Sequence, residues 1–319
     1  MTIVKSDCGS LVTVVLGSNH DDQNLGTQSW EILFRMDKIS AETAHFCGFS
    51  SRGTGMATSE SLVLSETPAD SQGAIRLIRL NYPAKRNALS LPLRAELLAA
   101  VENAMTEDAV RAIVLTGSGG AFCAGGDISS MQNAGGVAGR QRLANLHRLV
   151  RLLVAGPKPV IAAVEGYAYG AGMSLALLCD QVVAASDAKF CCSFGKVGLM
   201  PDMAALWTVP QRVDAGWVKR LLMLAEEVDG ETAVRIGLAD QIAAPGEALN
   251  TALALAARFA AQAPLPIAFT KAALARGPQP LEALLALEAD NQALLFNSED
   301  FAEGRDAFLA KRKPVFKGR

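Results

Sequence analysis

The residues from Gly119 to Ser130 read GGAFCAGGDISS, and those from Glu165 to Ser174 read EGYAYGAGMS. Each segment is rich in glycine and alanine, follows an apolar run that predicts a buried strand, and leads into a predicted helix. Glycine permits positive φ and a close approach to the backbone, and a helix N-terminus leaves N–H groups without partners inside the helix. Together the two turns could therefore aim two main-chain N–H groups at one carbonyl oxygen. Taken separately, each also fits an ordinary connection between a strand and a helix of an α/β protein.

Composition and charge argue against several classes of protein. Half of the 319 residues are hydrophobic and 19% are charged, which is typical of a well-buried globule of one large or two modest domains. The formal net charge of −2 provides no basic surface, so we expect no nucleic-acid partner. The six cysteines form neither a C-x-x-C pair nor a metal-ligand spacing, which predicts free thiols and no metal.

Cofactors and membranes receive no support from the sequence either. Neither glycine-rich turn fits the dinucleotide fingerprint or the P-loop pattern. The apolar runs are shorter than the ~20 residues that a membrane-spanning helix needs, and no secretory signal is visible. We therefore expect no membrane association and a cytoplasmic location.

The chain divides into three parts by its patterning. Residues 1–72 show no sustained periodicity, which predicts an N-terminal extension that is flexible or partly ordered. A regulatory or targeting segment, or a natural start at Met56, are the alternatives. Residues 73–260 alternate strand and helix patterns, which predicts a parallel α/β core. Residues 261–319 predict helices whose apolar faces need a partner, as in a lid or an oligomerisation region.

The pattern is clearest at the start of the predicted core. Residues 73–81, GAIRLIRLN, alternate apolar and basic side chains, which predicts a half-buried strand. A helix is predicted next, with Ser90 as its N-cap and an apolar face at four-residue spacing. That face consists of Leu93, Leu97, Val101 and Met105.

These motifs, in this order, resemble the crotonase superfamily, the enoyl-CoA hydratase/isomerase family. The similarity runs from about residue 73 to residue 317 and includes PAKRNALS, GSGGAFCAGGDI, KPVIAAVEGYAYGAG, KVGLMPD and FAEGRDAFLAKRKPVFK. It implies an α/β fold, a crotonase-like spiral of ββα repeats followed by C-terminal helices that form homotrimers or, as dimers of trimers, hexamers. It also implies an acyl-CoA substrate and no cofactor besides the coenzyme A that the substrate carries.

The resemblance assigns roles to particular residues. The backbone N–H groups of Gly126 and Ala171 would form an oxyanion hole for the thioester carbonyl. Coenzyme A would lie along two loops, with a contribution from the C-terminal helices of the same or a neighbouring subunit. The implied binding residues are Lys85, Arg86, Ala88, Ala124, Gly126, Asp127, Ile128, Ala171, Phe296 and Lys311. Arg86 can pair with phosphate but also fits a solvated loop, and Asp127 also fits a helix cap.

The residues at the reacting centre bear on the type of reaction. Hydratases of the family use two glutamates, and this chain has Ser174 and Phe194 at those positions, neither of which is a general base near neutral pH. Asp202, in GLMPD, lies where isomerases of the family carry an acid, and its apolar neighbours predict a raised pKa. The resemblance thus implies an isomerase that shifts a C=C bond with Asp202 as its single base. A hydratase, a thioester hydrolase, a non-catalytic acyl-CoA-binding protein, and a capping role for Asp202 are the alternatives.

Overall fold

The computed structural model describes residues 2–5, 11–14, 61–131 and 136–319. The chain divides into two compact units, Met1–Ala57 and Thr58–Arg319. In the first unit, β1 (Thr2–Lys5) pairs antiparallel with β2 (Leu11–Val14). The Met56 alternative concerns residues outside the described part of the chain.

The second unit begins before the predicted limit at residue 72. Its first strand, β3 (Val63–Glu66), pairs antiparallel with β4 (Ile75–Leu80), which is the strand predicted from GAIRLIRLN. The sequence of β3 shows only four residues of weak alternation, so the pattern alone did not separate it from the preceding extension. Residues 63–66 therefore belong to the main sheet rather than to the extension.

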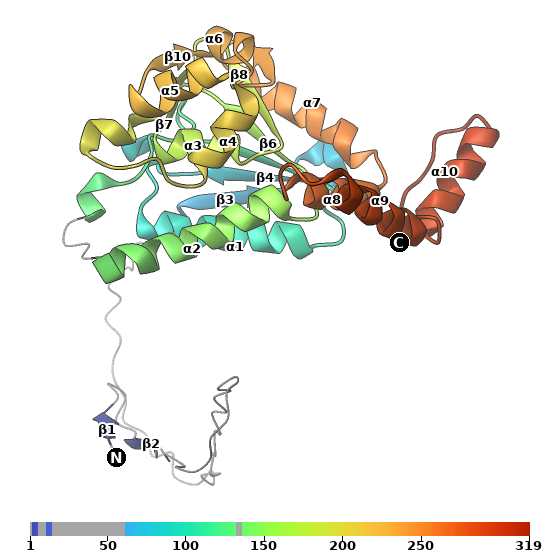
Figure 1. Cartoon of the computed structure of the whole chain (residues 1–319), viewed down its shortest axis with the longest axis horizontal. Helices are drawn as coiled ribbons and strands as arrows, with labels where there is room; N and C mark the ends of the chain where they lie inside the picture. Colours follow the sequence, from blue (N-terminus) through green and yellow to red (C-terminus); the bar gives the residue numbers. More distant parts are fainter. Residues whose placement is uncertain (1, 6–10, 15–60, 132–135) are drawn as a thin grey trace, which may run out of the picture. The chain divides into compact units, whose positions relative to one another are not determined.

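A six-stranded sheet forms the centre of this unit, in the order β11-β8-β6-β5-β4-β3 (Figure 1). Its strands beyond β4 are β5 (Ala112–Gly117), β6 (Val160–Val164), β8 (Gln181–Ala185) and β11 (Gln241–Ala243). Neighbouring strands from β4 to β11 run parallel, as the alternation of strand and helix predicts. Every residue of β6 is buried, as expected for a central strand of a parallel sheet with both faces covered.

Helices cover this sheet. The Ser90 side chain accepts a hydrogen bond from Leu93 N at 3.3 Å and caps α1 (Leu91–Thr106), and the predicted apolar face of that helix is buried. α1 packs against β3, β4 and α2 (Gly136–Ala155). α7 (Ala248–Ala260) crosses β4, β5, β6 and β8 and buries three alanines spaced four residues apart. The small alanine side chains allow this helix to lie close to the strands.

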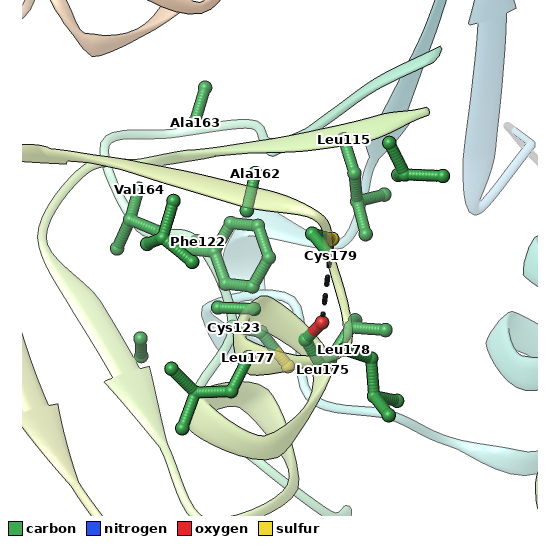
Figure 2. Packing of buried hydrophobic residues seen from close by; sticks show 14 of the residues in the cluster. Leu115, Phe122, Cys123, Ala162, Ala163, Val164, Leu175, Leu177, Leu178 and Cys179 are labelled. Atoms are coloured by element: carbon green, nitrogen blue, oxygen red, sulfur yellow. Dashed lines mark hydrogen bonds between the residues drawn. The ribbon is translucent and has the colours of Figure 1, made fainter. Parts of the chain in front are cut away.

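A smaller sheet in the order β10-β9-β7 completes the α/β part. Its strands are β7 (Tyr167–Tyr169), β9 (Lys189–Cys191) and β10 (Glu227–Asp229). α3 (Ala171–Leu177) follows β7 almost at once. Phe122 and Cys123, from the first glycine-rich turn, are buried in one core with residues of β5, β6 and α3 (Figure 2). The predicted α/β fold class is confirmed.

Helices dominate the rest of the chain, also as predicted. α4 (Ala205–Arg212), α5 (Ala215–Met223) and α6 (Gly230–Arg235) lie before α7, and α8 (Pro264–Leu274), α9 (Leu281–Leu295) and α10 (Glu299–Leu309) follow it. α9 packs on α8, and α10 extends away from the sheet (Figure 1). Among the described residues, no single helix is long and apolar enough to span a membrane. α7 and α8 reach the required length and apolar composition only when they are taken together, and the two helices are bent by 109° relative to each other.

A buried ion pair attaches α8 to the α/β core. The Lys271 ammonium is buried and donates to Lys158 O at 2.9 Å and to the Asp180 carboxylate at 2.5 Å. The same carboxylate oxygen accepts a hydrogen bond from Val160 N at 2.7 Å, at the start of β6. Cys123, Cys179, Cys191 and Cys192 are free thiols, while Cys8 and Cys47 lie outside the described residues.

Asn87 fixes the loop before α1 to the first glycine-rich turn. Its side chain is fully buried, and its Oδ1 accepts a hydrogen bond from Tyr82 N at 2.8 Å. Its Nδ2 donates to Ser118 O at 2.9 Å and to Ala121 O at 2.7 Å. One side chain thus satisfies three main-chain groups from two segments.

We expect Asn87→Gly to lower the free energy of unfolding by at least ~2 kcal/mol, because three main-chain groups lose their partner at once. Glycine tolerates the positive φ of 58° at this position, so the loss reports mainly the side-chain hydrogen bonds. Urea denaturation of both proteins measures the difference. Asn103→Ala, at an exposed position of α1, is the control and should change stability by less than ~0.5 kcal/mol. Equal stability of Asn87→Gly and the unmutated chain would contradict the role of this side chain.

Candidate active site

The two glycine-rich turns lie side by side and are joined by main-chain hydrogen bonds. Phe122 N donates to Glu165 O and Cys123 N donates to Tyr167 O, both at 2.8 Å. Tyr169 N donates back to Cys123 O at 2.9 Å. The two segments that the sequence analysis singled out are therefore brought together by the fold.

The two turns approach each other closely at Gly125. A Cβ atom at this residue, whose φ is +99°, would lie 2.7 Å from Tyr169 O and 3.6 Å from Ala171 N. Ala171 is the first residue of α3, where an N–H has no acceptor within the helix. Among the described residues, neither Gly126 N nor Ala171 N donates a hydrogen bond. Two unbonded donors on adjacent turns are suited to an oxygen that gains negative charge.

The loop predicted to contact coenzyme A lies against the first turn. Ala124 N donates to Arg86 O at 2.9 Å, and Leu89 N donates to Gly125 O at 2.7 Å. The exposed Arg86 guanidinium lies over the Tyr167 ring, 4.9 Å from its centroid. Stacking of this kind restricts the side chain while leaving N–H groups available for an anion.

Asp127 is engaged with its neighbours. Its carboxylate accepts hydrogen bonds from Ser129 N at 3.2 Å and Ser129 Oγ at 2.6 Å, and it pairs with Lys85 Nζ at 3.1 Å. These hydrogen bonds hold the pKa of the Asp127 carboxyl below its ordinary value. The contacts with Ser129 begin the 3₁₀ turn η3 (Ile128–Met131), which favours the capping interpretation of this aspartate.

The other residues assigned to coenzyme A fall into two groups. Ala88 is buried and Ala124 half-buried beside the turn, and Ile128 is exposed next to it. Phe296 packs edge-on against Phe301 at the end of α9, and Lys311 follows α10. α9 packs on α8, and α10 extends away from the sheet (Figure 1), so both residues lie on the C-terminal helical part of the chain. Their contribution from a neighbouring subunit stays a prediction.

The positions at which the resemblance places the two hydratase glutamates hold no carboxyl group. Ser174 is buried in α3, and its hydroxyl donates to Gly170 O at 3.3 Å. Phe194 is buried after β9. Glu165, beside the second turn, accepts hydrogen bonds from Gly246 N and Ala248 N and so caps α7. These hydrogen bonds hold the Glu165 carboxylate in a structural role, so it is not available for proton transfer.

Asp202 is a half-buried residue with one carboxyl oxygen, Oδ1, that is buried and has no hydrogen-bond partner in the described part of the chain. Burial raises the pKa of the Asp202 carboxyl, and the charges of Arg94, His147 and Arg142 oppose that rise. The predicted direction of the pKa shift is therefore found.

The backbone that follows Asp202 is strained. Met203 and Ala204 both have positive φ, 49° and 60°, which costs non-glycine residues about 1–3 kcal/mol each. Ala204, not Asp202, is the N-cap residue of α4, and no side chain caps that helix. The structure thus gives no support to a capping role for Asp202.

Arg94 is a site residue that the sequence analysis missed. It lies half-buried on α1, and its Nε donates to Leu89 O at 2.8 Å. Leu89 is in turn the bridge partner of Gly126, so the guanidinium lies beside the first turn. Arg94 directly follows Leu93 of the apolar face, and helix periodicity alone gives no sign that such a position points to a site rather than to solvent.

Comparison with known proteins agrees with this geometry. A family model described as enoyl-CoA hydratase/isomerase matches residues 70–319. The chain belongs to the enoyl-CoA hydratase/isomerase family. A crotonyl-CoA hydratase of Syntrophomonas wolfei is 36% identical over 244 residues, which are 76% of this chain and 94% of that protein. A 1,2-epoxyphenylacetyl-CoA isomerase of Escherichia coli is 35% identical over 250 residues, 77% of this chain and 95% of that protein.

Solved structures of the enoyl-CoA hydratase/isomerase family share the fold. An enoyl-CoA hydratase from Polaromonas sp. JS666 superposes with a TM-score of 0.75 at 35% identity, covering 80% of this chain and 99% of the other. The expected crotonase fold and the family are both confirmed, and the family acts on acyl-CoA. The N-terminal residues before 70 lie outside the family match.

We expect Asp202→Asn to make the folded chain more stable than the unmutated protein near pH 7. The folded state keeps a proton on Asp202 in a pH range where the unfolded chain has lost it, so the free energy of unfolding falls as pH rises between the two pKa values. Asparagine has no charge to bury and avoids that loss. Denaturation at about pH 4 and about pH 7 should show the advantage of Asp202→Asn growing with pH.

Asp187→Asn, in the exposed turn after β8, is the matched control and should show no such growth. A stability difference for Asp202→Asn that is the same at both pH values would contradict the raised pKa.

Proposed function

We propose that this chain is an acyl-CoA isomerase that shifts a C=C bond of an enoyl-CoA thioester. In this proposal the N–H groups of Gly126 and Ala171 hold the enolate oxygen, and Asp202 moves the proton. The observation that carries the proposal is the half-buried Asp202 carboxyl, whose buried Oδ1 lacks a hydrogen-bond partner among the described residues and whose pKa is raised. Ser174 and Phe194, at the positions of the hydratase glutamates, supply no second carboxyl.

The chemistry follows from the thioester. Sulfur donates weakly into the carbonyl, so a proton on the adjacent carbon becomes acidic once the oxygen is held. For a 3-enoyl-CoA, the Asp202 carboxylate takes a proton from C2, and the electron pair spreads over a dienolate. The resulting carboxylic acid returns that proton to C4, which leaves the double bond between C2 and C3. No atom is gained or lost, so one carboxyl group is sufficient.

Energetic considerations are consistent with this division of roles. One oxyanion donor contributes about 2.7–4 kcal/mol to transition-state stabilisation in enzymes of this general kind. A carboxyl group is a stronger base when its pKa is raised toward the working pH. Burial at Asp202 therefore favours proton transfer, at the cost of stability in the ionised state.

Hydration is the second candidate, because several relatives are named as hydratases. It would require Asp202 alone to position and activate water for addition across the C2=C3 bond. One Escherichia coli relative is named as an isomerase and another as a hydratase, so the case for the first candidate rests on the site residues and not on the names. Hydrolysis of the thioester and binding without turnover are the remaining alternatives, and the experiment below separates all four.

We expect Asp202→Asn to lower the turnover of 3-enoyl-CoA to 2-enoyl-CoA by at least ~10², because the amide cannot accept the proton. Separate incubations with 3-enoyl-CoA and 2-enoyl-CoA, followed by chromatography, distinguish bond migration from water addition, and a thiol reagent detects hydrolysis. Asp187→Asn should keep full turnover. Near-normal turnover of Asp202→Asn would reject Asp202 as the base, and tight binding with no turnover of either substrate would favour the non-catalytic alternative.

We further propose that the chain assembles as a homotrimer or hexamer through its C-terminal helices. α9 has no buried residue, and large apolar side chains are exposed along the C-terminal helices. They include Leu281, Leu285, Leu294, Phe296, Phe308 and Leu309. Several large exposed apolar side chains on neighbouring helices are typical of a subunit interface.

Light scattering coupled to gel filtration should give the mass of three or six chains. Leu285→Glu should shift the mass toward the monomer, because a buried charge without a partner opposes assembly. Glu282→Gln, which changes an exposed charge on the same helix, should leave the mass unchanged. A monomer for the unmutated protein would contradict the assembly.

A further inference from the structure

The residues that follow α10 run back along that helix. We call residues 313–318 the strap. The buried Asp300 carboxylate, in the first turn of α10, accepts hydrogen bonds from two main-chain N–H groups of the strap, Lys317 N at 2.6 Å and Gly318 N at 2.8 Å. Hydrogen bonds to a charged acceptor are stronger than those between neutral groups, so this carboxylate holds the strap firmly.

A second set of contacts lies further along α10. The Glu303 carboxylate accepts a hydrogen bond from Val315 N at 2.8 Å and pairs with both terminal nitrogens of Arg312, at 2.6 and 2.7 Å. The hydrogen bonds from Arg312 and Val315 lower the pKa of the Glu303 carboxyl to about 2. Gly304 leaves room for the Phe316 ring, which would lie 3.4 Å from a Cβ atom at that position. The strap is thus attached to the first two turns of α10.

The strap also contacts the α/β part of the chain. Arg111, which directly precedes β5, donates from its guanidinium to Phe316 O at 3.2 Å. Gly318 has a φ of +82°, and a Cβ atom there would lie 2.9 Å from Pro264 Cγ and 3.5 Å from the Arg111 guanidinium. Pro264 is the first residue of α8. The strap therefore links α10 to the start of β5 and to the start of α8.

Packing against other helices holds α10 only loosely. In the described part of the chain, α10 has no extensive contact with another helix or strand. A hollow of about 740 Å³, lined mainly by apolar side chains, lies between α10, α8 and α9, and Phe316 of the strap lines it too. Figure 1 shows α10 standing away from the sheet. The direction of α10 therefore depends on the strap rather than on close packing against a neighbouring helix.

We propose that the strap locks α10 in the position in which its exposed apolar side chains, Phe308 and Leu309, meet a second copy of this chain. Asp300 and Arg111 are positioning residues, because they attach the strap to α10 and to the α/β part. With the strap detached, α10 pivots about its junction with α9 while the α/β part keeps its fold. The inference rests on the proposed assembly for the second copy, but not on the proposed proton transfer.

Gly318→Val tests the lock, because valine is strained at this φ and its side chain would meet Pro264. We expect the main-chain N–H groups of α10 to exchange with deuterium at least about tenfold faster, since a short helix without tertiary contacts is marginal in water. Those of α1 and β5 should keep their rates. Arg111→Gln, which removes the hydrogen bond to Phe316 O, should give a smaller increase at α10. Mass spectrometry of peptides from the exchanged protein measures these rates.

Two controls separate the lock from other causes. Lys313→Gln, at an exposed position of the strap, should leave the exchange of α10 unchanged. Because a second copy would also protect α10, the comparison is repeated in Leu285→Glu, which keeps the strap and is expected to be monomeric. Adding Gly318→Val to Leu285→Glu should again speed up the exchange of α10 about tenfold. An unchanged rate in either comparison would overturn the lock, as would equally faster exchange in α1 and β5.

Light scattering over a series of protein concentrations tests the second part of the proposal. Gly318→Val should fall to the mass of the monomer at a concentration at least about tenfold higher than the unmutated protein. Unchanged assembly in spite of faster exchange at α10 would overturn the link between the strap and the second copy. A monomeric unmutated protein would overturn that link together with the proposed assembly. None of these measurements involves turnover, so a failure of Asp202 as the base would leave the inference standing.

Discussion

The main chain at residues 122–125 and at residues 165–172 approaches so closely that side chains are excluded from the contact. A Cβ atom at Gly172 would lie 2.2 Å from Cys123 O, and one at Gly125 would lie 2.7 Å from Tyr169 O. Hydrogen bonds between the segments hold this approach in place. The start of α3, the loop before α1 and the guanidinium of Arg94 all take their positions from these two turns. The chemistry proposed for this chain depends on them in the same way, because unbonded N–H groups serve as fixed donors only where the backbone cannot move.

In the proposed role of Asp202, the demands of proton transfer and of folding stability oppose each other. The carboxyl lies in a partly apolar place, has an unpartnered oxygen among the described residues, and precedes two non-glycine residues with positive φ. Each of these features costs free energy of folding. A chain selected only for stability would have little reason to keep them together. Their coincidence at one residue is therefore an argument for a role in proton transfer that does not depend on resemblance.

Much of the fold follows from local sequence patterns. The strand at 75–80, the Ser90 cap and the buried face of α1 were predictable because periodicity and capping are local signals. The strand β3 was not predictable, because four residues at a sheet edge carry little pattern. It forms a strand through its pairing with β4. Around the candidate site, the sequence also predicted the raised pKa of Asp202, while the roles of Asp202 and of the two turns stay predictions. The place of Arg94 was not predictable, because it depends on a hydrogen bond to Leu89 O that helix periodicity does not encode. The positions of Phe296 and Lys311 likewise depend on the path of α9 and α10, which no local motif specifies.

The Asp180 carboxylate joins two parts of the molecule that are far apart in the sequence. One of its oxygens receives both the ammonium of Lys271 on α8 and the first main-chain N–H of β6, the strand that runs directly into the second glycine-rich turn. α8 also supports the C-terminal helices that expose their apolar surface. The C-terminal helices and the strand that leads into the second glycine-rich turn are therefore connected through a single carboxylate, so a displacement of α8 would act directly on the first residue of β6.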